Sequence, residues 1–545
     1  MVVGWTSPAA YAVARTRSRE RVDAGMAVGQ ARTAELRLAE LMAAISLATD
    51  LQHGYPLETG LRRTLLAVGL ARELGLEGQD LSDVYYTALL EQLGCTGGAH
   101  ELAAFFGGDE IAALRAGLTL DPRIIGQAIL GLAKQSPIDA AALVTRSAVA
   151  GARMARAHLA SACESADRLA RRLGMSNGVL RALGHAVARW DGWGIALGIP
   201  PISGESIALP ARITSLAVDV AIHLDHGGHR AALAMVRQRA GKTFDPTVAR
   251  TFLQHADGLL AQVEVESVWD AAIAAEPEPR PWLPASRLDQ VAQAFADFVD
   301  LKSPYTLSHS TGVAHIAEGT ARAIGLDDSA VVAVRRAGLL HDLGRLSVPN
   351  GIWDKRGSLT HADWERVRLH PYYTERILTC SPALRALAQT AGMHHERLDG
   401  SGYHHGLLAS SLSKAARVLC AADAYQAMTE ERPHRQALSP AEAADQLSQE
   451  AKTGRFDREV VDAVLASAGH TRVRERAAWP AGLSEREVQV LRLVAQAKSE
   501  KEIARQLFIS IHTVHHHVKQ IYEKTGVSTR AGAALFAMEN DLILH

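Results

Sequence analysis

Histidine and aspartate residues in the central region of the chain are of the types that form metal centres. His341 and Asp342 are adjacent in LLHDLGR (339–345), near the end of an apolar helical stretch. Imidazole and carboxylate together suit Fe, Mn or Zn rather than Mg or Ca. A carboxylate can bridge two cations about 3.5–4 Å apart, and such a pair activates a hydroxide for in-line displacement at phosphorus. The candidate ligands are His309, His341, Asp342, His370, His394, His395 and Asp423.

These candidates lie in sequence with helical periodicity. Apolar residues recur at spacings of three and four, as in LRRTLLAVGLARELGL (61–76), and strand-like alternation is rare. We therefore expect an all-α protein of tandem helical domains and a C-terminal helical bundle. Proline-rich stretches indicate the linkers. The predicted divisions are an irregular lead-in (1–30), a first helical domain (31–265), a Pro-rich linker (266–286), a metal domain (287–470), a second linker (471–482) and a C-terminal module (483–545).

The first helical domain is a second copy of the metal domain. YPLETGLRRTLLAVGLARELGL (55–76) aligns without a gap with YTLSHSTGVAHIAEGTARAIGL (305–326), and LLEQLGC (89–95) aligns with LLHDLGR at the same shift. Such collinear self-similarity predicts a duplication. The first copy has lost the ligands and is predicted to be metal-free: it serves either as a ligand-binding or regulatory partner or only as a structural scaffold. The aligned positions hold Thr59, Glu91, Gln92, Ala186 and Val187, and Asp219 alone matches a ligand, Asp423.

Composition and charge exclude several classes of protein. The 545 residues carry a formal net charge of −1, so any DNA-binding surface must be local. The four cysteines are scattered without a CxxC pair, as expected in a reducing compartment. No apolar run approaches the roughly 18 residues of a membrane span, and the N-terminal residues lack the pattern of a signal peptide. We expect a cytoplasmic protein with no membrane partner.

The region from about 300 to 466 resembles the HD-GYP family of HD-domain phosphohydrolases, which includes cyclic-di-GMP phosphodiesterases. The resemblance rests on the His341–Asp342 doublet, the HHERLDGSGY block (394–403) and the CAADAYQAM helix (420–428). It implies a dinuclear centre of Fe or Mn, with Zn as a further possibility, held by the seven candidates named above. It also implies that Asp342 and Arg345 take part in catalysis and that the ligand is a phosphorylated small molecule or a cyclic dinucleotide.

Three positions depart from the family pattern. Arg345 stands where the family usually has lysine, so a phosphate clamp is kept but not a proton donor near neutral pH. Tyr305 stands where some members have a glutamate for a third metal, which favours two metals. His404 replaces the proline of the Gly-Tyr-Pro triplet, which bears on recognition of a cyclic dinucleotide. The histidines without a matching role are expected to be surface or packing residues: His315, His361, His404 and His405. Two acidic residues, Glu396 and Asp399, are expected to orient ligands or shape the loop.

The C-terminal module has the pattern of three short helices. Ser484 with Glu487, and Ser499 with Glu502, are capping boxes, and Ser510 can cap a third helix. The stretch 483–533 closely resembles the LuxR-type helix-turn-helix, which implies that a helix over about 511–525 enters the major groove of double-stranded DNA and that the protein binds as a dimer. A protein-binding module is the alternative. The predicted DNA-facing residues are His512, Thr513, His515, His516, Lys519, Gln520, Lys524 and Arg530, of which Lys519, Lys524 and Arg530 are expected to contact phosphates.

Three functions therefore remain open. The chain is a transcription regulator whose metal domain hydrolyses a phosphoester or cyclic dinucleotide, or one whose metal domain only senses such a ligand without turnover. The complete ligand set favours the first, and Arg345 with the missing proline favours the second. An enzyme whose helix-turn-helix is only an interaction module is the third reading.

Overall fold

The computed structural model describes residues 35–117, 140–193, 202–469 and 479–543. Within these ranges the chain is helical apart from two three-residue strands, β1 (Glu35–Arg37) and β2 (Trp282–Pro284), which pair antiparallel. The all-α prediction is confirmed. The predicted lead-in, 1–30, lies outside the described residues. None of the helices in the described ranges has the length and apolar character needed to cross a membrane.

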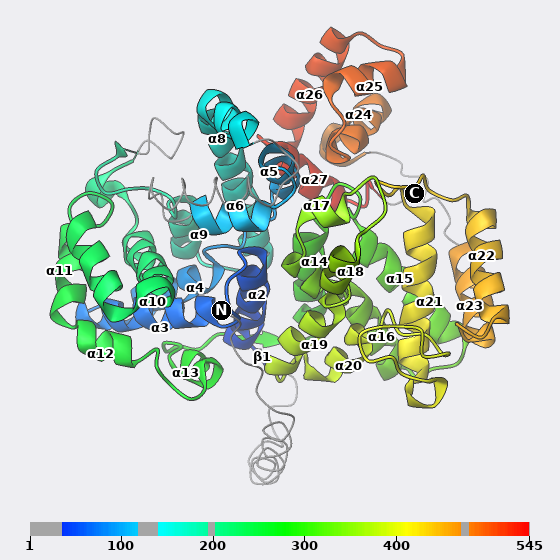
Figure 1. Ribbon diagram of the computed structural model, residues 1–545, viewed down its shortest axis with the longest axis horizontal. Coiled ribbons are helices and arrows are strands. Elements are labelled where there is room, and N and C mark those ends of the chain that lie inside the picture. Colours follow the sequence, from blue (N-terminus) through cyan, green and yellow to red (C-terminus); the bar gives the residue numbers. More distant parts are fainter. Residues whose placement is uncertain (1–34, 118–139, 194–201, 470–478, 544–545) are drawn as a thin grey trace.

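The first copy forms the left half of the molecule in Figure 1. Its long helix α8 rises toward the C-terminal module, and α3 and α10 pack against each other below and to the left of it. The helices are α2 (Leu38–Gln52), α3 (Thr59–Glu73), α4 (Gly78–Leu90), α5 (Ala99–Phe106), α6 (Glu110–Gly117), α8 (Ala140–Arg172), α9 (Asn177–Gly184), α10 (Leu209–Arg239), α11 (Pro246–Gln254), α12 (Ala256–Ala261) and α13 (Val268–Ala274).

The second copy forms the right half (Figure 1). Its centre is the packing of α15 against α16, α21 and α23. The helices are α14 (Leu288–Asp300), α15 (His309–Ala323), α16 (Asp328–Leu340), the 3₁₀ turn η4 (Leu343–Ser347), α17 (Asn350–Trp353), α18 (His361–Val367), α19 (His370–Cys380), α20 (Arg385–Gly392), α21 (Lys414–Thr429), α22 (Pro440–Lys452) and α23 (Arg458–Gly469).

The two copies repeat each other in local geometry. Residues Glu58 and Ser308 both adopt a left-handed conformation, with φ of 76° and 63°, immediately before α3 and α15. Asp50 accepts a hydrogen bond from the Gly60 N–H at 2.9 Å, and the Asp300 carboxylate accepts one from the Ser310 N–H at 2.9 Å. These pairs are related by the same shift as the sequence repeat, so the structure supports a duplication.

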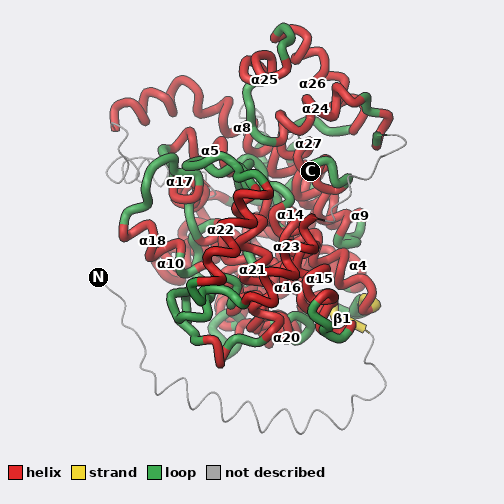
Figure 2. Tube along the Cα trace, turned by 90° about the vertical axis from the view of Figure 1, so that its right-hand side faces the viewer, coloured by secondary structure: helices red, strands yellow, loops and turns green. Residues whose placement is uncertain are grey.

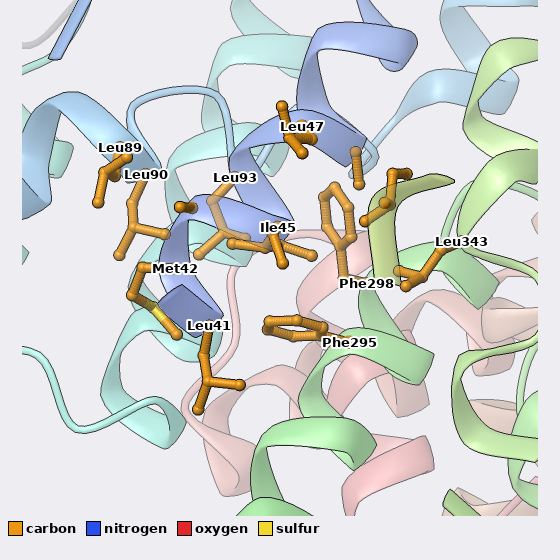
Figure 3. Close-up of a cluster of buried hydrophobic side chains, with 14 of the residues drawn as sticks. Leu41, Met42, Ile45, Leu47, Leu89, Leu90, Leu93, Phe295, Phe298 and Leu343 are labelled. Carbon is orange, nitrogen blue, oxygen red and sulfur yellow. The ribbon is translucent and has the colours of Figure 1, made fainter. Parts of the chain in front are cut away.

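One hydrophobic core joins the two copies. In Figure 3, Leu41, Met42 and Ile45 of α2 lie beside Phe295 and Phe298 of α14. Helix α2 also packs against η4 and α19 of the second copy. The residues expected to form a plain linker, 266–286, instead contain α13, which buries Val268, Ala272 and Ile273, and β2, which pairs with β1. The prolines there lie outside α13, where they leave its helical hydrogen bonds intact.

A buried ion pair crosses the same junction. The Lys302 ammonium lies 2.7 Å from a carboxylate oxygen of Glu110 and 3.0 Å from the side-chain oxygen of Gln52, both in the first copy. The Glu110 carboxylate also accepts the Asn350 backbone N–H at 2.9 Å. Nearby, Gly108 and Gly351 approach so closely that a Cβ on Gly351 would lie 2.5 Å from the Gly108 Cα. The loop after the HD doublet is therefore braced by the first copy.

The C-terminal module stands above the two copies (Figure 2). Its helices are α24 (Glu485–Ala495), α25 (Glu500–Leu507), α26 (Ile511–Thr525) and α27 (Arg530–Glu539). Both predicted capping boxes are present, and Ser510 accepts the Thr513 N–H. Helix α27 packs on α24 and also on α8 of the first copy, with Ala534 and Leu535 in the main core.

Candidate metal centre and nucleic-acid interface

Helix ends bring the predicted ligands together. His309 and His370 are the first residues of α15 and α19, and His341 caps the C-terminal end of α16 with Asp342 next to it. His394 and His395 follow α20, and Asp423 lies within α21. All seven predicted ligands lie close together, and all but His395 are buried.

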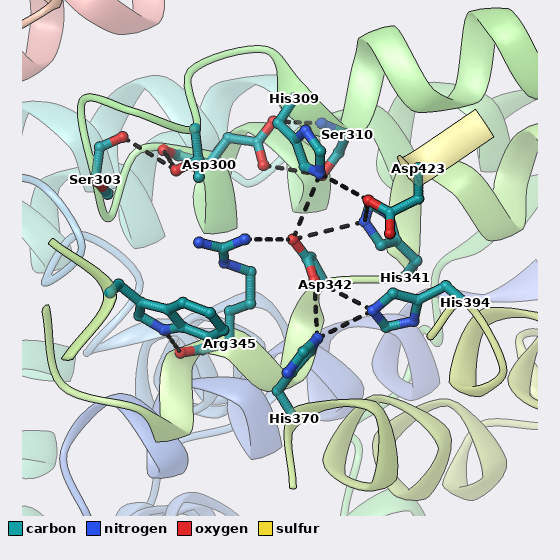
Figure 4. Close-up of polar contacts among 12 residues, drawn as sticks. Asp300, Ser303, His309, Ser310, His341, Asp342, Arg345, His370, His394 and Asp423 are labelled. Carbon is teal, nitrogen blue, oxygen red and sulfur yellow. Dashed lines mark hydrogen bonds and ion pairs between the residues drawn. The ribbon is translucent and has the colours of Figure 1, made fainter. Parts of the chain in front are cut away.

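Asp342 lies at the centre of this cluster, as Figure 4 shows. Its Oδ2 is 3.9 Å from the Nε2 of His309 and 3.5 Å from that of His341. Its Oδ1 is 3.5 Å from the Nε2 of His370 and 3.6 Å from that of His394. Each oxygen of one carboxylate thus faces two imidazoles.

Asp423 and His395 complete the two sides. Asp423 Oδ1 is 3.2 Å from His309 Nε2 and 3.7 Å from His341 Nε2, and its Oδ2 is 3.6 Å from His395 Nδ1. The donor atoms of His309, His341 and Asp423 form one metal-sized group, and those of His370, His394 and His395 form another.

Hydrogen bonds to backbone carbonyls orient three of the imidazoles. The Nδ1 atoms of His341, His370 and His394 lie 2.7, 2.5 and 2.7 Å from the carbonyl oxygens of the residues three positions earlier. A carbonyl only accepts, so each Nδ1 carries a proton and each ring turns its Nε2 inward. Such bonds fix the tautomer of metal-binding histidines.

The inward Nε2 atoms are crowded together in a buried space. The Nε2 atoms of His370 and His394 are only 3.0 Å apart, and the buried Nε2 of His341 has no hydrogen-bond partner. Two lone pairs at that distance repel unless a cation lies near both. The donor set therefore fits divalent metal ions.

The electrostatics of the site agree with this fit. Burial lowers the pKa of His370 to about 4 and that of His394 to about 3, so both rings are neutral near pH 7. Burial acts to raise the pKa of Asp342, but His341 and Arg345 hold it well below its ordinary value. Burial opposes charge on His309, yet Glu430 and Asp423 raise its pKa to about 10, which marks this point as one that favours a cation.

Arg345 is tied to the bridging carboxylate. Its guanidinium donates to Asp342 Oδ2 at 3.0 Å and lies 4.0 Å from the ring centroid of Trp353. The Trp353 indole N–H in turn donates to the Arg345 carbonyl at 3.3 Å. The stacked guanidinium is therefore held at the edge of the site, where it neutralises Asp342 and can face an anionic ligand.

Sequence reasoning missed Glu430. Its carboxylate accepts from His309 Nδ1 at 2.9 Å and from Arg432 at 2.7 Å, so it orients a ligand from behind. The only sequence signal was its place in MTEERPH (428–434), after the helix that carries Asp423. Glu396, expected to shape its loop, does so: it accepts the backbone N–H groups of His405 and Leu407 at 2.8 Å each.

In the first copy, arginine side chains pair with the carboxylates at the positions that correspond to the candidate metal centre. The buried Arg63 guanidinium lies 3.1 Å from Glu91, the counterpart of His341, and donates to the Ala88 carbonyl at 3.1 Å. Arg239 forms an ion pair with Asp219. Among the described residues, the His, Cys, Asp and Glu groups able to hold a metal include none from the first copy.

Helix α26 presents only part of the predicted DNA surface. Side chains of His512, His515, His516 and Lys519 are exposed, and Thr513 and Gln520 are half-buried. Lys524 is also exposed, and its ammonium bonds both oxygens of the buried Glu487 at 2.7 and 2.8 Å. Arg530 likewise donates to the Lys498 carbonyl at 3.1 Å and turns toward the first copy. The helix spacing did not reveal these partners, and the phosphate contacts of both residues remain predictions.

Two known protein families match two separate parts of the chain. The HD domain family model matches residues 293–460, and the model of bacterial regulatory proteins of the luxR family matches residues 481–537. The first match contains all seven metal-site residues, and the second contains α24, α25 and α26.

Individual relatives extend the similarity to the first copy. The 3′3′-cGAMP-specific phosphodiesterase 3 of Vibrio cholerae is 31% identical over 412 residues, which cover 74% of this chain and 88% of the relative. The cyclic di-GMP phosphodiesterase PA4108 of Pseudomonas aeruginosa is 35% identical over 179 residues, 32% of this chain and 43% of the relative. The crystal structure of the cyclic GMP-AMP specific phosphodiesterase V-cGAP3 of V. cholerae superposes with a TM-score of 0.55 at 27% identity, covering 80% of this chain and 98% of that one.

Proposed function

The chain belongs to the HD-GYP-type HD-domain family and carries a LuxR-family domain, and from this premise we propose that it is a DNA-binding regulator whose second copy hydrolyses a cyclic dinucleotide. The observation that carries the proposal is the position of Asp342, with two imidazoles before each of its oxygens. Relatives named as cGAMP and cyclic di-GMP phosphodiesterases support the choice of ligand.

In this proposal, two groups of side chains would hold the divalent ions, His309, His341 and Asp423 on one side and His370, His394 and His395 on the other, with Asp342 between them. The two ions would supply an activated hydroxide and charge stabilisation at the phosphorus. The protein's own part is to orient three of the imidazoles through their Nδ1–H bonds and to keep Asp342 ionised beside Arg345. The Arg345 guanidinium would orient the phosphodiester by charge.

A sensor without turnover is the second candidate, and one observation favours it. Arg345 is always protonated near neutral pH and is already bonded to Asp342, so it cannot donate a proton to a leaving group. In that reading, a cyclic dinucleotide binds the metal centre and changes DNA binding without being cleaved.

A chain of ion pairs would couple the metal centre to the DNA-binding domain under either reading. Asp300, at the end of α14, holds Ser310 next to His309. One turn earlier, Asp297 bonds Arg172 of α8 at 2.6 Å, and the same guanidinium lies 3.6 Å from Glu539 of α27. A ligand that shifts α15 and α14 would therefore act on α27, and with it on the two subunits of a DNA-bound homodimer.

Hydrolysis and metal content together test the proposal. Wild-type protein purified without oxygen is expected to hold about two Asp342-dependent Fe, Mn or Zn ions per chain and to linearise 3′3′-cGAMP or cyclic di-GMP. The variant Asp342→Asn should lose these ions and the hydrolysis, whereas the surface variant His361→Ala should keep both. Metal and ligand binding without any cleavage would select the sensor, and a chain that retains no metal would refute both readings.

DNA binding is tested separately by selecting duplexes from a random library. Enrichment of a two-fold symmetric site by the wild type, lost on replacement of His516 and Lys519 by alanine, is the expected result. Retention of the same sites by that variant would contradict the assignment of α26 as the reading helix.

A further inference from the structure

The loop that follows the metal ligands carries a second cluster of donor atoms. Residues 396–408 contain His404, at the position of the family's proline, and His405 beside it. Both imidazoles face Glu375 on the neighbouring helix α19 rather than the dinuclear centre. The Nε2 of His405 is 3.0 Å from Glu375 Oε2, and the Nε2 of His404 is 3.7 Å from the same oxygen.

The spacing of these atoms suits one metal ion. One donor from each of the three residues lies within 4.8 Å of the others. In a tetrahedral zinc site with bonds of about 2.1 Å, neighbouring donors are about 3.4 Å apart, so the observed 3.0 and 3.7 Å need only small rotations.

The ring nitrogens of His404 lack a binding partner, and a metal ion would supply one. Its side chain is only 14% exposed, and neither ring nitrogen has a hydrogen-bond partner. A buried polar atom without a partner costs about 1–3 kcal/mol. A packing histidine would be expected to bond through at least one nitrogen, so this ring is better explained as a ligand.

The surrounding structure holds the three residues in place. Glu396 accepts the backbone N–H groups of His405 and Leu407 at 2.8 Å each, which fixes the loop. Glu375 crosses Gly392, where a Cβ would lie 2.8 Å from the Glu375 Cβ, so the glycine leaves room for this carboxylate. The site is built from the loop and α19, and it shares no residue with the dinuclear centre.

We propose that Glu375, His404 and His405 form a separate zinc site that clamps the 396–408 loop onto α19. Three protein ligands leave a fourth position open to water or a ligand atom. Tyr403, next to His404, has its ring 4.8 Å from that of His395, which at 22% is the most exposed of the dinuclear ligands. Zinc here would therefore fix Tyr403 beside the solvent-facing side of the dinuclear centre. The proposal does not depend on hydrolysis.

The test uses the full chain with the dinuclear site removed by four alanine substitutions, at His309, His341, Asp342 and His394. Zinc is titrated against a chromophoric chelator. We expect one zinc per chain in this background, and an affinity weakened by about tenfold or more by either Glu375→Gln or His404→Ala. The matched control His315→Ala and His361→Ala should leave the affinity unchanged. Zinc should also slow amide hydrogen exchange in residues 403–408.

A second measurement guards against misfolding of that background. In the otherwise wild-type chain, replacing His404 and His405 by alanine should lower the zinc content by one ion per chain while the Asp342-dependent metal remains. Undiminished zinc content in this variant, or equal zinc affinity in the Glu375→Gln chain and its parent, overturns the proposal. Loss of hydrolysis alone would bear on the proposed function and not on this site.

Discussion

Removing the Glu110 carboxylate should damage the metal centre from the other copy of the repeat. The Lys302 ammonium is 3% exposed and has three acceptors: Glu110 at 2.7 Å, Gln52 at 3.0 Å and the Leu346 carbonyl at 3.5 Å. In Glu110→Gln the shape is kept, but the buried ammonium loses its counter-charge. Breaking such a pair on one side costs about 3–5 kcal/mol, and we expect a loss of that size in the free energy of unfolding.

The reverse change should cost less, because the carboxylate can take up a proton. Burial already raises the pKa of Glu110, and Lys302 opposes that shift. In Lys302→Met the pKa rises further, so the carboxyl is neutral over a wider range of pH. A raised folded-state pKa means that stability is kept below the unfolded value near 4.5 and lost as pH rises through the folded value. Lys302→Met should therefore approach wild-type stability in acid and fall behind it toward neutral pH.

A double-mutant cycle in urea, with metal content as a second readout, tests this reasoning. Replacing both residues together, Glu110→Gln with Lys302→Met, should cost less than the sum of the two single changes, since no charge is left buried. Each single variant should also retain less metal, because Glu110 holds the Asn350 N–H just beyond η4. The exposed pair of Glu318 and Arg322 supplies the control, and Glu318→Gln should change neither readout. Additive single and double variants would refute the argument.

Three further predictions follow from individual contacts. Lys519→Ala should weaken DNA binding and lower the slope of log affinity against log salt by about 1; an unchanged slope would count against a phosphate contact of Lys519. Lys524→Ala should instead lower the melting temperature of the DNA-binding domain, because it leaves the buried carboxylate of Glu487 without its cation. Arg172→Ala should loosen the α8–α27 contact, seen as faster amide exchange in α27, and unchanged exchange would remove this arginine from the coupling path. Burial opposes charge on His100, but the 2.8 Å bond to Asp354 raises its pKa. The stability that this pair gives to the junction is therefore present below about pH 6.5 and lost as pH rises. The difference in urea midpoint between wild type and His100→Gln should shrink as pH rises, and a constant difference would contradict the assignment.

The predictable features were those encoded by local sequence. Capping boxes at Ser484 and Ser499 predicted the starts of two helices, and the helix predicted at 511–525 is the observed α26, because a cap needs partners only three residues away. The seven candidate metal ligands were chosen from residue types and family resemblance, and the structure brings them together. Their partition around Asp342 could not be predicted, since which imidazole faces which oxygen is decided by helices far apart in sequence.

Contacts over long sequence separations escaped prediction for the same physical reason. Glu430 reaches His309 across 121 residues, and Glu110 reaches Lys302 across 192. Helix periodicity places Lys524 on an outer face, but the periodicity cannot show that Glu487 of another helix approaches that face. The linker at 266–286 was predicted from its prolines. The short apolar run before them forms α13, which packs against α2 and α3.

The loss of ligands in the first copy also has a physical explanation. In the first copy Asp219 is a retained acid and Glu91 stands in place of His341, and carboxylates in a dry interior need a cation or a proton. Arg63 and Arg239 supply fixed guanidinium charges to Glu91 and Asp219. Burial still raises the pKa of Asp219 to about 7, so the replacement only partly offsets desolvation. A copy converted in this way no longer needs metal to fold, and it can contribute α2, Gln52 and Glu110 to the second copy whether or not that copy is loaded. The duplication is thus better understood as a metal-independent brace for a metal-dependent site than as a spare enzyme.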